Sequence, residues 1–383
     1  MKLSDFTMKQ INIALDGQPG KLGVWKSGSR GCLLGIGEYA GKKYQIKIHS
    51  SEPKWYNVDE EIRRVRSELS GAAEEDRERL QSELNALQRA KPDRDRRDTI
   101  SNQFIDMRQK LVRSLNSIDT PLIVANVDIW KEQVPFSGNA TYAIEATPWL
   151  DCVAVGLTDD NNAPLMFNRD LTTEQQYNIV ASLADVVAKV HANGIVHGDI
   201  KIGNTLITQE NGEFKVALID FDNAFILDDL RMRKYPLDVW YYVIGGTHIA
   251  PEFTDFVAIV REAQDEDMYN DFDMNTITEK ADIFSLGATI YEYFCGRVDG
   301  LGPGLLPYVG PDGDVLDVNE YGAAINFGYK LELPNTIPDF LYGMFNWMLA
   351  PNPADRPTAV QVRDAFTSAN ISMIPTPFLR SAQ

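Results

Sequence analysis

Residues 195–207 read Ile-Val-His-Gly-Asp-Ile-Lys-Ile-Gly-Asn-Thr-Leu-Ile, and residues 214–222 read Phe-Lys-Val-Ala-Leu-Ile-Asp-Phe-Asp. The apolar runs in this stretch, separated by a polar turn, are typical of buried strands. Two carboxylates and one amide stand on the short loops beside them, namely Asp199, Asp220 and Asn204. A carboxylate accepts a proton from an attacking hydroxyl, and carboxylate and amide oxygens are ligands for Mg²⁺, so this set suits phosphoryl transfer.

The pattern His-x-Asp-x-Lys-x-x-Asn, followed by Asp-Phe, resembles the catalytic and metal loops of the protein kinases. The resemblance points to a eukaryotic-like Ser/Thr protein kinase of bacterial type, with the motif His-Gly-Asp in its catalytic loop. It implies that Asp199 is the catalytic base and that Lys201 steadies the transferred phosphate. Asn204 and Asp220 would then hold the Mg²⁺ ions that accompany ATP.

Two residues depart from the pattern of the family that this stretch resembles. Gly198 stands where many members have Arg, and Asp222 stands where the third position of the metal loop is usually Gly. Without that arginine the catalytic loop has no cation to bind an activation-loop phosphate. We therefore expect activity that does not require phosphorylation of the activation loop.

Residues 22–48 show short apolar runs broken by glycines, which is typical of β-strands and turns. Gly28 and Gly31 match the second and third glycines of the kinase pattern Gly-x-Gly-x-x-Gly, but Lys26 replaces the first, and a plain hairpin is an equally good interpretation. The sequence Tyr-Gln-Ile-Lys, ending at Lys47, stands where the family has Val-Ala-Ile-Lys. The resemblance implies that Lys47 neutralises the α- and β-phosphates of ATP.

Residues 58–118 carry apolar side chains at helical spacing among dense Glu and Arg, with breaks near Ser70 and Lys91, which predicts three helices. A kinase needs one helix here, and that helix supplies an acid to pair with the strand lysine. Glu61 is the first choice for this acid. Glu68 and Asp106 are the alternatives.

The remaining helical residues, about 71–98, form a charged insertion near the helix that carries the acid. A solvated helical hairpin is the simpler interpretation of this insertion. A docking site for a partner protein on residues 58–118 is the alternative.

Residues 141–146 predict a strand that ends at a hinge between two lobes, Glu145-Ala146-Thr147-Pro148. The resemblance implies that backbone groups of Glu145 and Thr147 pair with the adenine of ATP. Pro148 lacks an N–H and removes one donor from this hinge. Further on, residues 172–193 predict a buried helix that begins at Thr172 or Thr173 and leads to His197, which we expect to be a scaffold residue.

The sequence Gly-Thr-His-Ile-Ala-Pro-Glu at residues 246–252 resembles the end of the activation segment of Ser/Thr kinases, although it is two residues shorter. The resemblance implies that Thr247 bonds near Asp199 and Lys201, an arrangement associated with Ser/Thr acceptors.

Two further positions are expected to hold this region in place. Asp282, in Asp-Ile-Phe-Ser-Leu-Gly, would accept backbone hydrogen bonds from the catalytic loop. Arg356 would form a buried ion pair with Glu252.

Taken together, the motifs predict an α+β, two-lobed protein kinase-like fold with a helical insertion in its N-lobe. The expected organisation is an N-terminal extension, an N-lobe, a C-lobe and a loose C-terminal tail, at residues 1–20, 21–146, 147–374 and 375–383.

Charge and cysteine content limit the partners and the setting. The net charge of −18 and the pI near 4.7 argue against nucleic acid or an anionic membrane as the main partner and make basic protein substrates plausible. Three scattered cysteines indicate neither a zinc site nor a disulfide framework and fit a reducing, cytoplasmic setting. No apolar run is long enough to span a bilayer, and no signal core begins the sequence, so we expect a soluble protein.

The sequence therefore predicts a protein kinase that uses ATP and Mg²⁺ to phosphorylate Ser/Thr hydroxyls of proteins. Two alternatives stay open. One is a small-molecule phosphotransferase of the aminoglycoside or choline kinase type, whose motifs are also similar. The other is a pseudokinase scaffold that binds partners and performs little chemistry.

Overall fold

The structure is a computed structural model. It describes the chain except for residues 1, 3–4, 6, 10, 13–21, 24–25, 28–32, 50–54, 72–75, 78, 82–83, 86–93, 124–127, 134–140, 149–152, 155–170, 211–212, 242, 261–264, 296–305, 317–319 and 381–383. The described chain divides into two compact units. The first comprises residues 1–112 and 126–149, and the second comprises residues 113–125 and 150–383.

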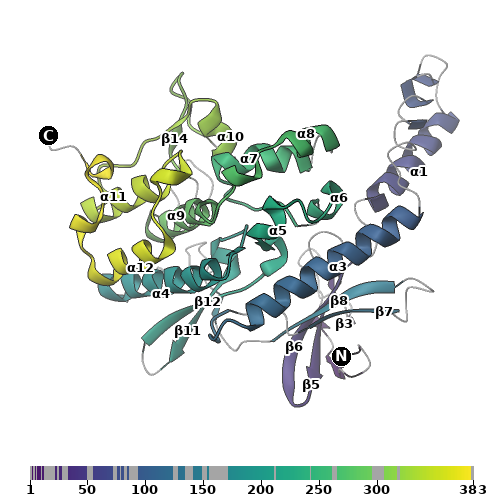
Figure 1. The fold of residues 1–383 in the computed structure, drawn as a ribbon, viewed down its shortest axis with the longest axis horizontal. Coiled ribbons are helices and arrows are strands. Elements are labelled where there is room, and N and C mark those ends of the chain that lie inside the picture. The colour runs from purple at the N-terminus through teal and green to yellow at the C-terminus, as the bar shows by residue number, and fades with distance from the viewer. Residues whose placement is uncertain are drawn as a thin grey trace. The chain divides into compact units, whose positions relative to one another are not determined.

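The first unit contains an antiparallel sheet with the strand order β1-β5-β6-β8-β7, in which β4 also pairs with β5 (Figure 1). β2 and β3 form a separate short pair. The strands are β1 (Thr7–Lys9), β2 (Ile11–Asn12), β3 (Leu22–Gly23), β4 (Lys26–Ser27), β5 (Leu33–Tyr39), β6 (Lys42–His49), β7 (Asp128–Gln133) and β8 (Thr141–Pro148).

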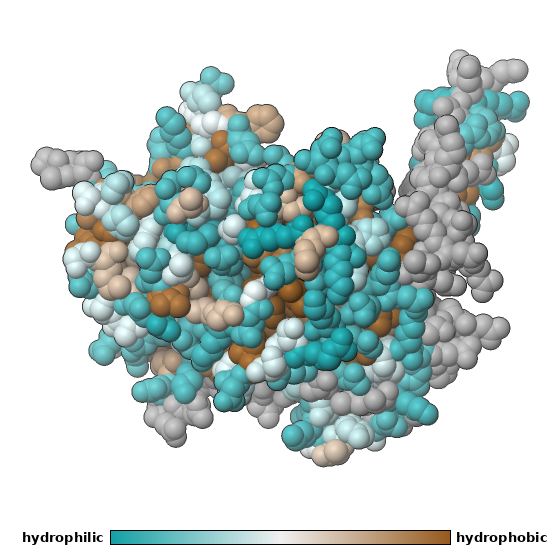
Figure 2. Space-filling model, in the orientation of Figure 1, coloured by the Kyte–Doolittle hydropathy of each residue, from teal (hydrophilic) through white to brown (hydrophobic). Residues whose placement is uncertain are grey.

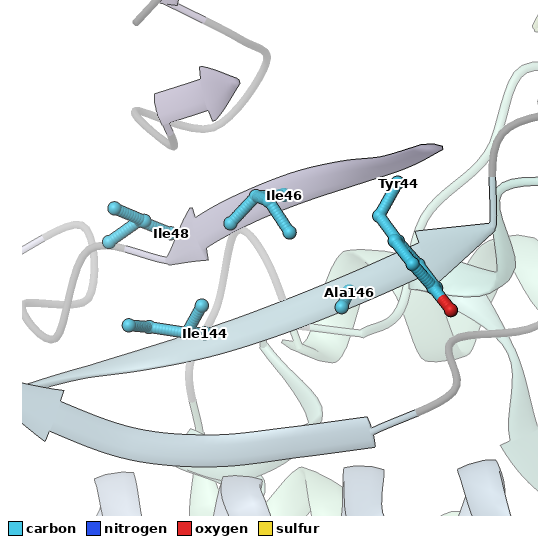
Figure 3. Close-up of a cluster of buried hydrophobic side chains, with 5 residues drawn as sticks. All are labelled: Tyr44, Ile46, Ile48, Ile144 and Ala146. Carbon is cyan, nitrogen blue, oxygen red and sulfur yellow. The ribbon is translucent and has the colours of Figure 1, made fainter. Parts of the chain in front are cut away.

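Side chains alternate between the two faces of this sheet, as they do in any β-strand. One face carries an apolar cluster from β6 and β8, which Figure 3 shows gathered between the two strands. The members of the cluster are Tyr44, Ile46, Ile48, Ile144 and Ala146. The intervening residues of β6 and β8, Lys47 and Glu145 among them, therefore belong to the opposite face.

Two long helices belong mainly to the first unit, α1 (Trp55–Gly71) and α3 (Arg94–Asn116). Described residues between 76 and 85 are also helical, and Leu80 and Leu84 pack against Ile62 and Val65 of α1. The sequence prediction of helices with breaks near residues 70 and 91 agrees with these ends.

The second unit is mainly helical. Its first long helix, α4 (Thr173–Ala192), begins at a capping box, because Thr172 Oγ1 accepts from the N–H of Gln175 at 3.2 Å and the Gln175 side chain accepts from the N–H of Thr172 at 2.8 Å. The predicted buried helix is thus confirmed, with Thr172 as its cap. Its buried face is built from apolar residues at helical spacing, including Ile179, Leu183 and Val190.

The short strands and the remaining helices follow α4 in the second unit. The strands are β9 (Val153–Ala154), β10 (Ile195–Val196), β11 (Thr205–Glu210), β12 (Glu213–Leu218), β13 (Phe225–Ile226), β14 (Tyr308–Val309) and β15 (Lys330–Leu331). The helices are α5 (Leu227–Arg231), α6 (Leu237–Trp240), α7 (Pro251–Ala258), α8 (Glu266–Asp271), α9 (Lys280–Cys295), α10 (Tyr321–Asn326), α11 (Asp339–Met348) and α12 (Ala359–Ser368).

Residues 375–380 differ from the loose tail that the sequence predicts. Arg380 forms an ion pair with Asp339 of α11 at 3.0 Å, and its guanidinium lies over the ring of Tyr342, 4.5 Å from the centroid. These contacts hold Arg380 against α11.

Within the described residues, no helix is both long and apolar enough to cross a bilayer.

Candidate active site

The loop that carries Asp199 and the loop that carries Asp220 are joined by a buried histidine. His197 is fully buried, and its Nδ1 accepts the N–H of Asp199 at 3.3 Å, so the ring proton is on Nε2. That Nε2 donates, at 3.1 Å, to the carbonyl of Ile219, which is the residue before Asp220. The structure thus gives His197 the scaffold position that the sequence predicts.

Asp282 of α9 fixes the start of the same loop. Its carboxylate accepts the backbone N–H groups of His197 and Gly198 at 2.7 and 2.9 Å, and it also bonds to Nε2 of His191 at 2.9 Å. Complete burial by itself raises the pKa of Asp282. The hydrogen bond and charge of His191, together with His197, lower the pKa by more than burial raises it, so the net shift is downward. The predicted backbone contacts of Asp282 are confirmed.

Asp199 is the centre of the hydrogen-bond network in this unit. Its Oδ2 accepts from Lys201 Nζ at 2.7 Å and from Asn204 Nδ2 at 3.1 Å. Its Oδ1 accepts from the N–H and the hydroxyl of Thr247 at 3.0 and 3.3 Å, and that hydroxyl also lies 3.3 Å from Lys201 Nζ. The expected contact of Thr247 with Asp199 and Lys201 is confirmed, despite the shortened segment that follows Thr247.

Two glycines allow the backbone to approach closely around Asp199. Gly198 has φ +74°, and a Cβ there would lie 2.7 Å from the carbonyl oxygen of Asn223. Gly246 has φ +143°, and a Cβ there would lie 2.5 Å from the carbonyl oxygen of Gly198. Both positions therefore require glycine, and an arginine at position 198 would not fit this backbone.

Asp220 has a left-handed backbone, with φ 60° and ψ 66°, although it is not glycine. Such a conformation is strained, and it persists only where the surroundings hold it. The buried ring of Phe221 packs 4.7 Å from the ring of His197, and the N–H of Ile219 donates to the carbonyl of Asn204 at 2.9 Å. These neighbours keep the Asp220 side chain at the surface beside the catalytic loop.

The oxygen atoms of Asn204 and Asp220 fit a magnesium site. Asn204 is buried, and its amide nitrogen donates to the carbonyl and carboxylate of Asp199, so its amide oxygen lies on the other side of the group. Magnesium is typically held by one or two carboxylates together with substrate phosphates. The described residues contain no cluster of three His, Cys, Asp or Glu side chains that could hold a metal ion.

In the first unit, Lys47 and Glu145 are directly opposite each other on β6 and β8. Glu145 is buried, and its Oε1 accepts from Nε of Arg108 on α3 at 3.0 Å, with both side chains 1% exposed. Gln109 of α3 also donates to the carbonyl of Ile129 on β7, at 3.0 Å. Helix α3 therefore packs on the sheet face that carries Lys47.

The expected role of Glu145 as a hinge residue is wrong. Strand β8 continues to Pro148, and Glu145 lies between Lys47 of β6 and Ile129 of β7. Because a neighbouring strand lies on each side, its backbone cannot pair with adenine. Thr147 lies at the end of β8, opposite Gln45, and its expected adenine contact stays a prediction.

Two of the three acids considered for Lys47 are also placed by the structure. Glu68 of α1 is exposed and pairs with Arg64 at 2.7 Å, and Asp106 is on the exposed side of α3. Neither is therefore seen to face the sheet, whereas Arg108 of α3 contacts Glu145 of β8. Glu61 lies in α1, but its side chain is outside the described residues, and Gly28 and Gly31 lie outside them too.

Glu252 and Arg356 form the buried ion pair that the sequence predicts. Arg356 Nη1 and Nη2 donate to the two carboxylate oxygens at 2.7 and 2.8 Å. The remaining guanidinium donors reach the carbonyls of Ala350, Lys280 and Pro351. Glu252 thus neutralises the guanidinium charge, and these carbonyls accept the N–H groups that do not reach Glu252.

Two buried residues, one in each unit, were missed from the sequence. His248 is 6% exposed, stacks on Tyr321, and has its pKa lowered to about 4 by burial, a shift that Asp199 opposes and Lys201 adds to. Arg108 was also missed, although it shares a helical stripe with Phe104 and Leu111. A cation within an apolar stripe was the signal that could have found it.

Residues 109–366 match the family model of the protein kinase domain. The chain belongs to the protein kinase family. Its two units and their mixture of sheet and helix are those of the α+β kinase fold that the sequence predicts. The match begins within α3 and includes the catalytic loop, Asp220, Glu252 and Arg356.

Among similar proteins, the serine/threonine-protein kinase PkaA of Streptomyces coelicolor is 29% identical over 192 residues, which are 50% of this chain and 29% of that protein. The serine/threonine-protein kinase PrkC of Bacillus subtilis is 26% identical over 198 residues, 51% of this chain and 24% of that protein. The inactive tyrosine-protein kinase RYK of Caenorhabditis elegans is 27% identical over 203 residues, 53% of this chain and 29% of that protein. The similarity covers less than a third of each of these relatives.

Proposed function

We propose that this kinase transfers the γ-phosphate of ATP to Ser/Thr hydroxyls of protein substrates and that the transfer requires Mg²⁺. The observation that carries the proposal is the network in which Asp199 accepts hydrogen bonds from both Lys201 and Thr247. This network places a carboxylate, an ammonium and a hydroxyl within one small, partly buried site.

Asp199 acts as the base in this proposal. Its carboxylate orients the substrate hydroxyl and accepts its proton as the oxygen attacks phosphorus. Lys201, whose ammonium is 2.7 Å from Asp199, orients the carboxylate and stabilises the negative charge on the transferred group. The hydroxyl of Thr247 holds Asp199 from the other side.

Asn204 and Asp220 would hold the metal through their side-chain oxygens, and Lys47 would bind the α- and β-phosphates. Bound Mg²⁺ supplies charge neutralisation on the phosphates. The hydrogen bond from Ile219 to Asn204 keeps the two metal-binding loops together. Thr147 is the remaining candidate for a contact with adenine.

Two features support a protein acceptor rather than a small alcohol. The segment Ala250-Pro251-Glu252 is close in sequence to Thr247 and is anchored by Arg356, and in the kinases that it resembles such a segment is the platform for a peptide. The acidic segment around α8 would favour basic substrates. Figure 2 shows hydrophilic residues over α8, and the exposed acids in and beside this helix are Asp265, Glu266, Asp267, Asp271 and Asp273.

A scaffold with little catalytic activity is the second candidate. It is favoured by Arg108, a cation at the helix position that faces the sheet, and one of the relatives is named an inactive kinase. Against it, Asp199, Lys201, Asn204 and Thr247 are held in mutual hydrogen bonds that a scaffold does not need.

Incubation with Mg²⁺ and γ-labelled ATP, with a basic protein and a panel of small alcohols as acceptors, tests the proposal. We expect label on Ser/Thr of the protein, and a loss of at least about 10²-fold in rate for Asp199→Asn and for Asp220→Asn. Label on a small alcohol instead would establish the small-molecule alternative. Equal, background-level transfer by wild type and Asp199→Asn, with ATP still bound, would establish the scaffold.

A further inference from the structure

The residue directly opposite Lys47 in the sheet is an acid, Glu145. We propose that Glu145 holds Lys47 in place and that Arg108 holds Glu145, so that three charged groups form one chain from α3 to β6. This inference rests on the proposed role of Lys47 in binding phosphates. It makes Glu145 and Arg108 positioning residues, since each acts through Lys47.

The register of the sheet provides the first step. Lys47 and Glu145 are directly opposite each other in an antiparallel pair, so their side chains project from the same face. The Cβ atoms of such a pair are about 5 Å apart, well within the reach of a lysine side chain. On its other side, Lys47 is opposite Leu34 of β5, which is apolar. Glu145 is therefore the charged cross-strand neighbour of Lys47.

The second step concerns what α3 presents to the sheet. The helix supplies Arg108, whose Nε donates to Glu145 Oε1 at 3.0 Å, and a cation at this place cannot attract Lys47. A carboxylate offers about four lone-pair positions, so Glu145 can accept from both cations. Arginine is suited to this inner place because its fork of donors remains charged in a buried site.

The third step concerns what fixes the lysine. An acid on a helix moves with that helix, whereas Glu145 and Lys47 are locked by the ladder of β6 and β8, which pairs residues 44–49 with residues 143–148. The position of the Lys47 ammonium is then set within the sheet. Helix α3 contributes by placing the Arg108 guanidinium beside Glu145, which is 1% exposed, so that this buried carboxylate has a charged partner.

The reactivity of Lys47 measures this chain of charges without relying on catalysis. The full-length protein is acylated with acetic anhydride at a series of pH values, and modification of Lys47 is followed by peptide mass spectrometry. Only the neutral amine reacts, so a neighbouring carboxylate slows the reaction and a neighbouring cation accelerates it.

We expect Glu145→Gln to accelerate acylation of Lys47 at pH 8 on the order of tenfold and Arg108→Gln to slow it. Opposite directions distinguish a positioning role from a structural one, because mere loosening of the sheet would accelerate both. Glu38→Gln is the matched control, since Glu38 of β5 is opposite Lys43 of the same strand β6. It should leave the Lys47 profile unchanged.

A background without Arg108 keeps the test decisive if Glu145→Gln alone fails to fold. Replacing both members of a buried ion pair is tolerated better than removing one. In Arg108→Met protein, adding Glu145→Gln should still accelerate acylation of Lys47. Identical Lys47 profiles for folded Arg108→Met and Arg108→Met/Glu145→Gln, or acceleration by both single variants, would overturn the proposal.

The last arm moves the acid to the helix. Arg108→Glu combined with Glu145→Met places a carboxylate on α3 and an apolar side chain of similar size on β8. This double variant should recover only part of the KM for ATP that Glu145→Gln raises on the order of tenfold, because a carboxylate on α3 is not fixed by the ladder of β6 and β8. If wild type itself transfers no phosphate, the proposed function fails, and the acylation profiles still decide the role of Glu145.

Discussion

Glu252 and Arg356, 104 positions apart, are joined by two parallel hydrogen bonds of 2.7 and 2.8 Å. The guanidinium is completely buried and the carboxylate side chain is 8% exposed. This pair fastens the segment that follows Thr247 to the loop before α12. The hydroxyl of Thr247 in turn donates to Asp199, so the ion pair helps to hold the segment that contacts Asp199.

Glu252→Ala should destabilise the protein by about 3 to 5 kcal/mol, because it leaves the Arg356 charge buried and unpaired. Denaturant unfolding measures the change. Glu68→Ala, which removes an exposed pair with Arg64, should change stability by no more than about 0.5 kcal/mol. Equal effects of the two substitutions would contradict a structural role for the buried pair.

His248 should make stability depend on pH between about 6.5 and 4. Burial lowers its pKa in the folded protein from 6.5 to about 4, so the unfolded chain binds the proton more tightly. The stabilisation is complete above the unfolded pKa and is lost as pH falls towards the folded one, by about 3 kcal/mol in all. His248→Phe keeps a ring beside Tyr321 and should remove this dependence. Parallel curves of unfolding free energy against pH for the two proteins would disprove it.

Gly198→Ala should cost clearly more stability than Gly194→Ala. Both glycines have a left-handed backbone, with φ +74° and +67°, so both substitutions incur strain of about 1 to 2 kcal/mol. A Cβ at position 198 would also meet the carbonyl oxygen of Asn223 at 2.7 Å, whereas nothing lies within 4 Å at position 194. Thermal unfolding of both variants gives the comparison, and a milder effect at 198 would refute the close packing.

Activity should not depend on phosphorylation of the activation segment. Between Asp220 and Glu252 the sequence has one Ser or Thr, Thr247, and its hydroxyl is already bonded to Asp199 and Lys201. Three tyrosines complete the hydroxyls of this segment. A variant with Phe at positions 235, 241 and 242, shown by mass spectrometry to carry no phosphate there, should retain the wild-type rate within about threefold. A large loss of rate would count against this expectation.

Removal of residues 72–93 should leave phosphate transfer within about twofold of the wild-type rate, since the contacts described for this segment are those of Leu80 and Leu84 with α1. The deletion uncovers Ile62 and Val65, which are 5% and 0% exposed, so it should also promote self-association. Adding Ile62→Gln and Val65→Gln should restore a monodisperse protein in size-exclusion chromatography. Failure of the repaired deletion to fold would show that the hairpin supports the rest of the unit.

The catalytic loop could be predicted well because its key contacts are local. Asp199, Lys201 and Asn204 lie within six consecutive residues, and the backbone that brings them together is specified by the same short motif. The hydrogen bonds of Asp282 and the ion pair of Arg356 join distant parts of the sequence. They were predictable because each residue belongs to a motif whose partner in the protein kinases is known from the resemblance.

The predictions for the first unit were less successful, and their failure has a physical cause. The apolar pattern of residues 141–146 predicts a strand but not the residue at which it ends, and β8 extends to Pro148. That extension turns Glu145 from an expected hinge residue into an interior one. The bounds of a strand depend on the neighbours that pair with it, and these come from distant parts of the chain.

The sequence by itself determined the contacts within the loop of Asp199 and the mixed fold, because motif spacing and apolar periodicity act over a few residues. Only the tertiary structure decided which charge α3 turns towards the sheet and which residue opposes Lys47. Arg108 and Glu145 are 37 positions apart, and they meet because helix packing and strand register bring them together. A buried charge is tolerated only where an opposite charge is close to it, and for this pair the partner comes from a distant part of the sequence. No short segment can specify such a pairing.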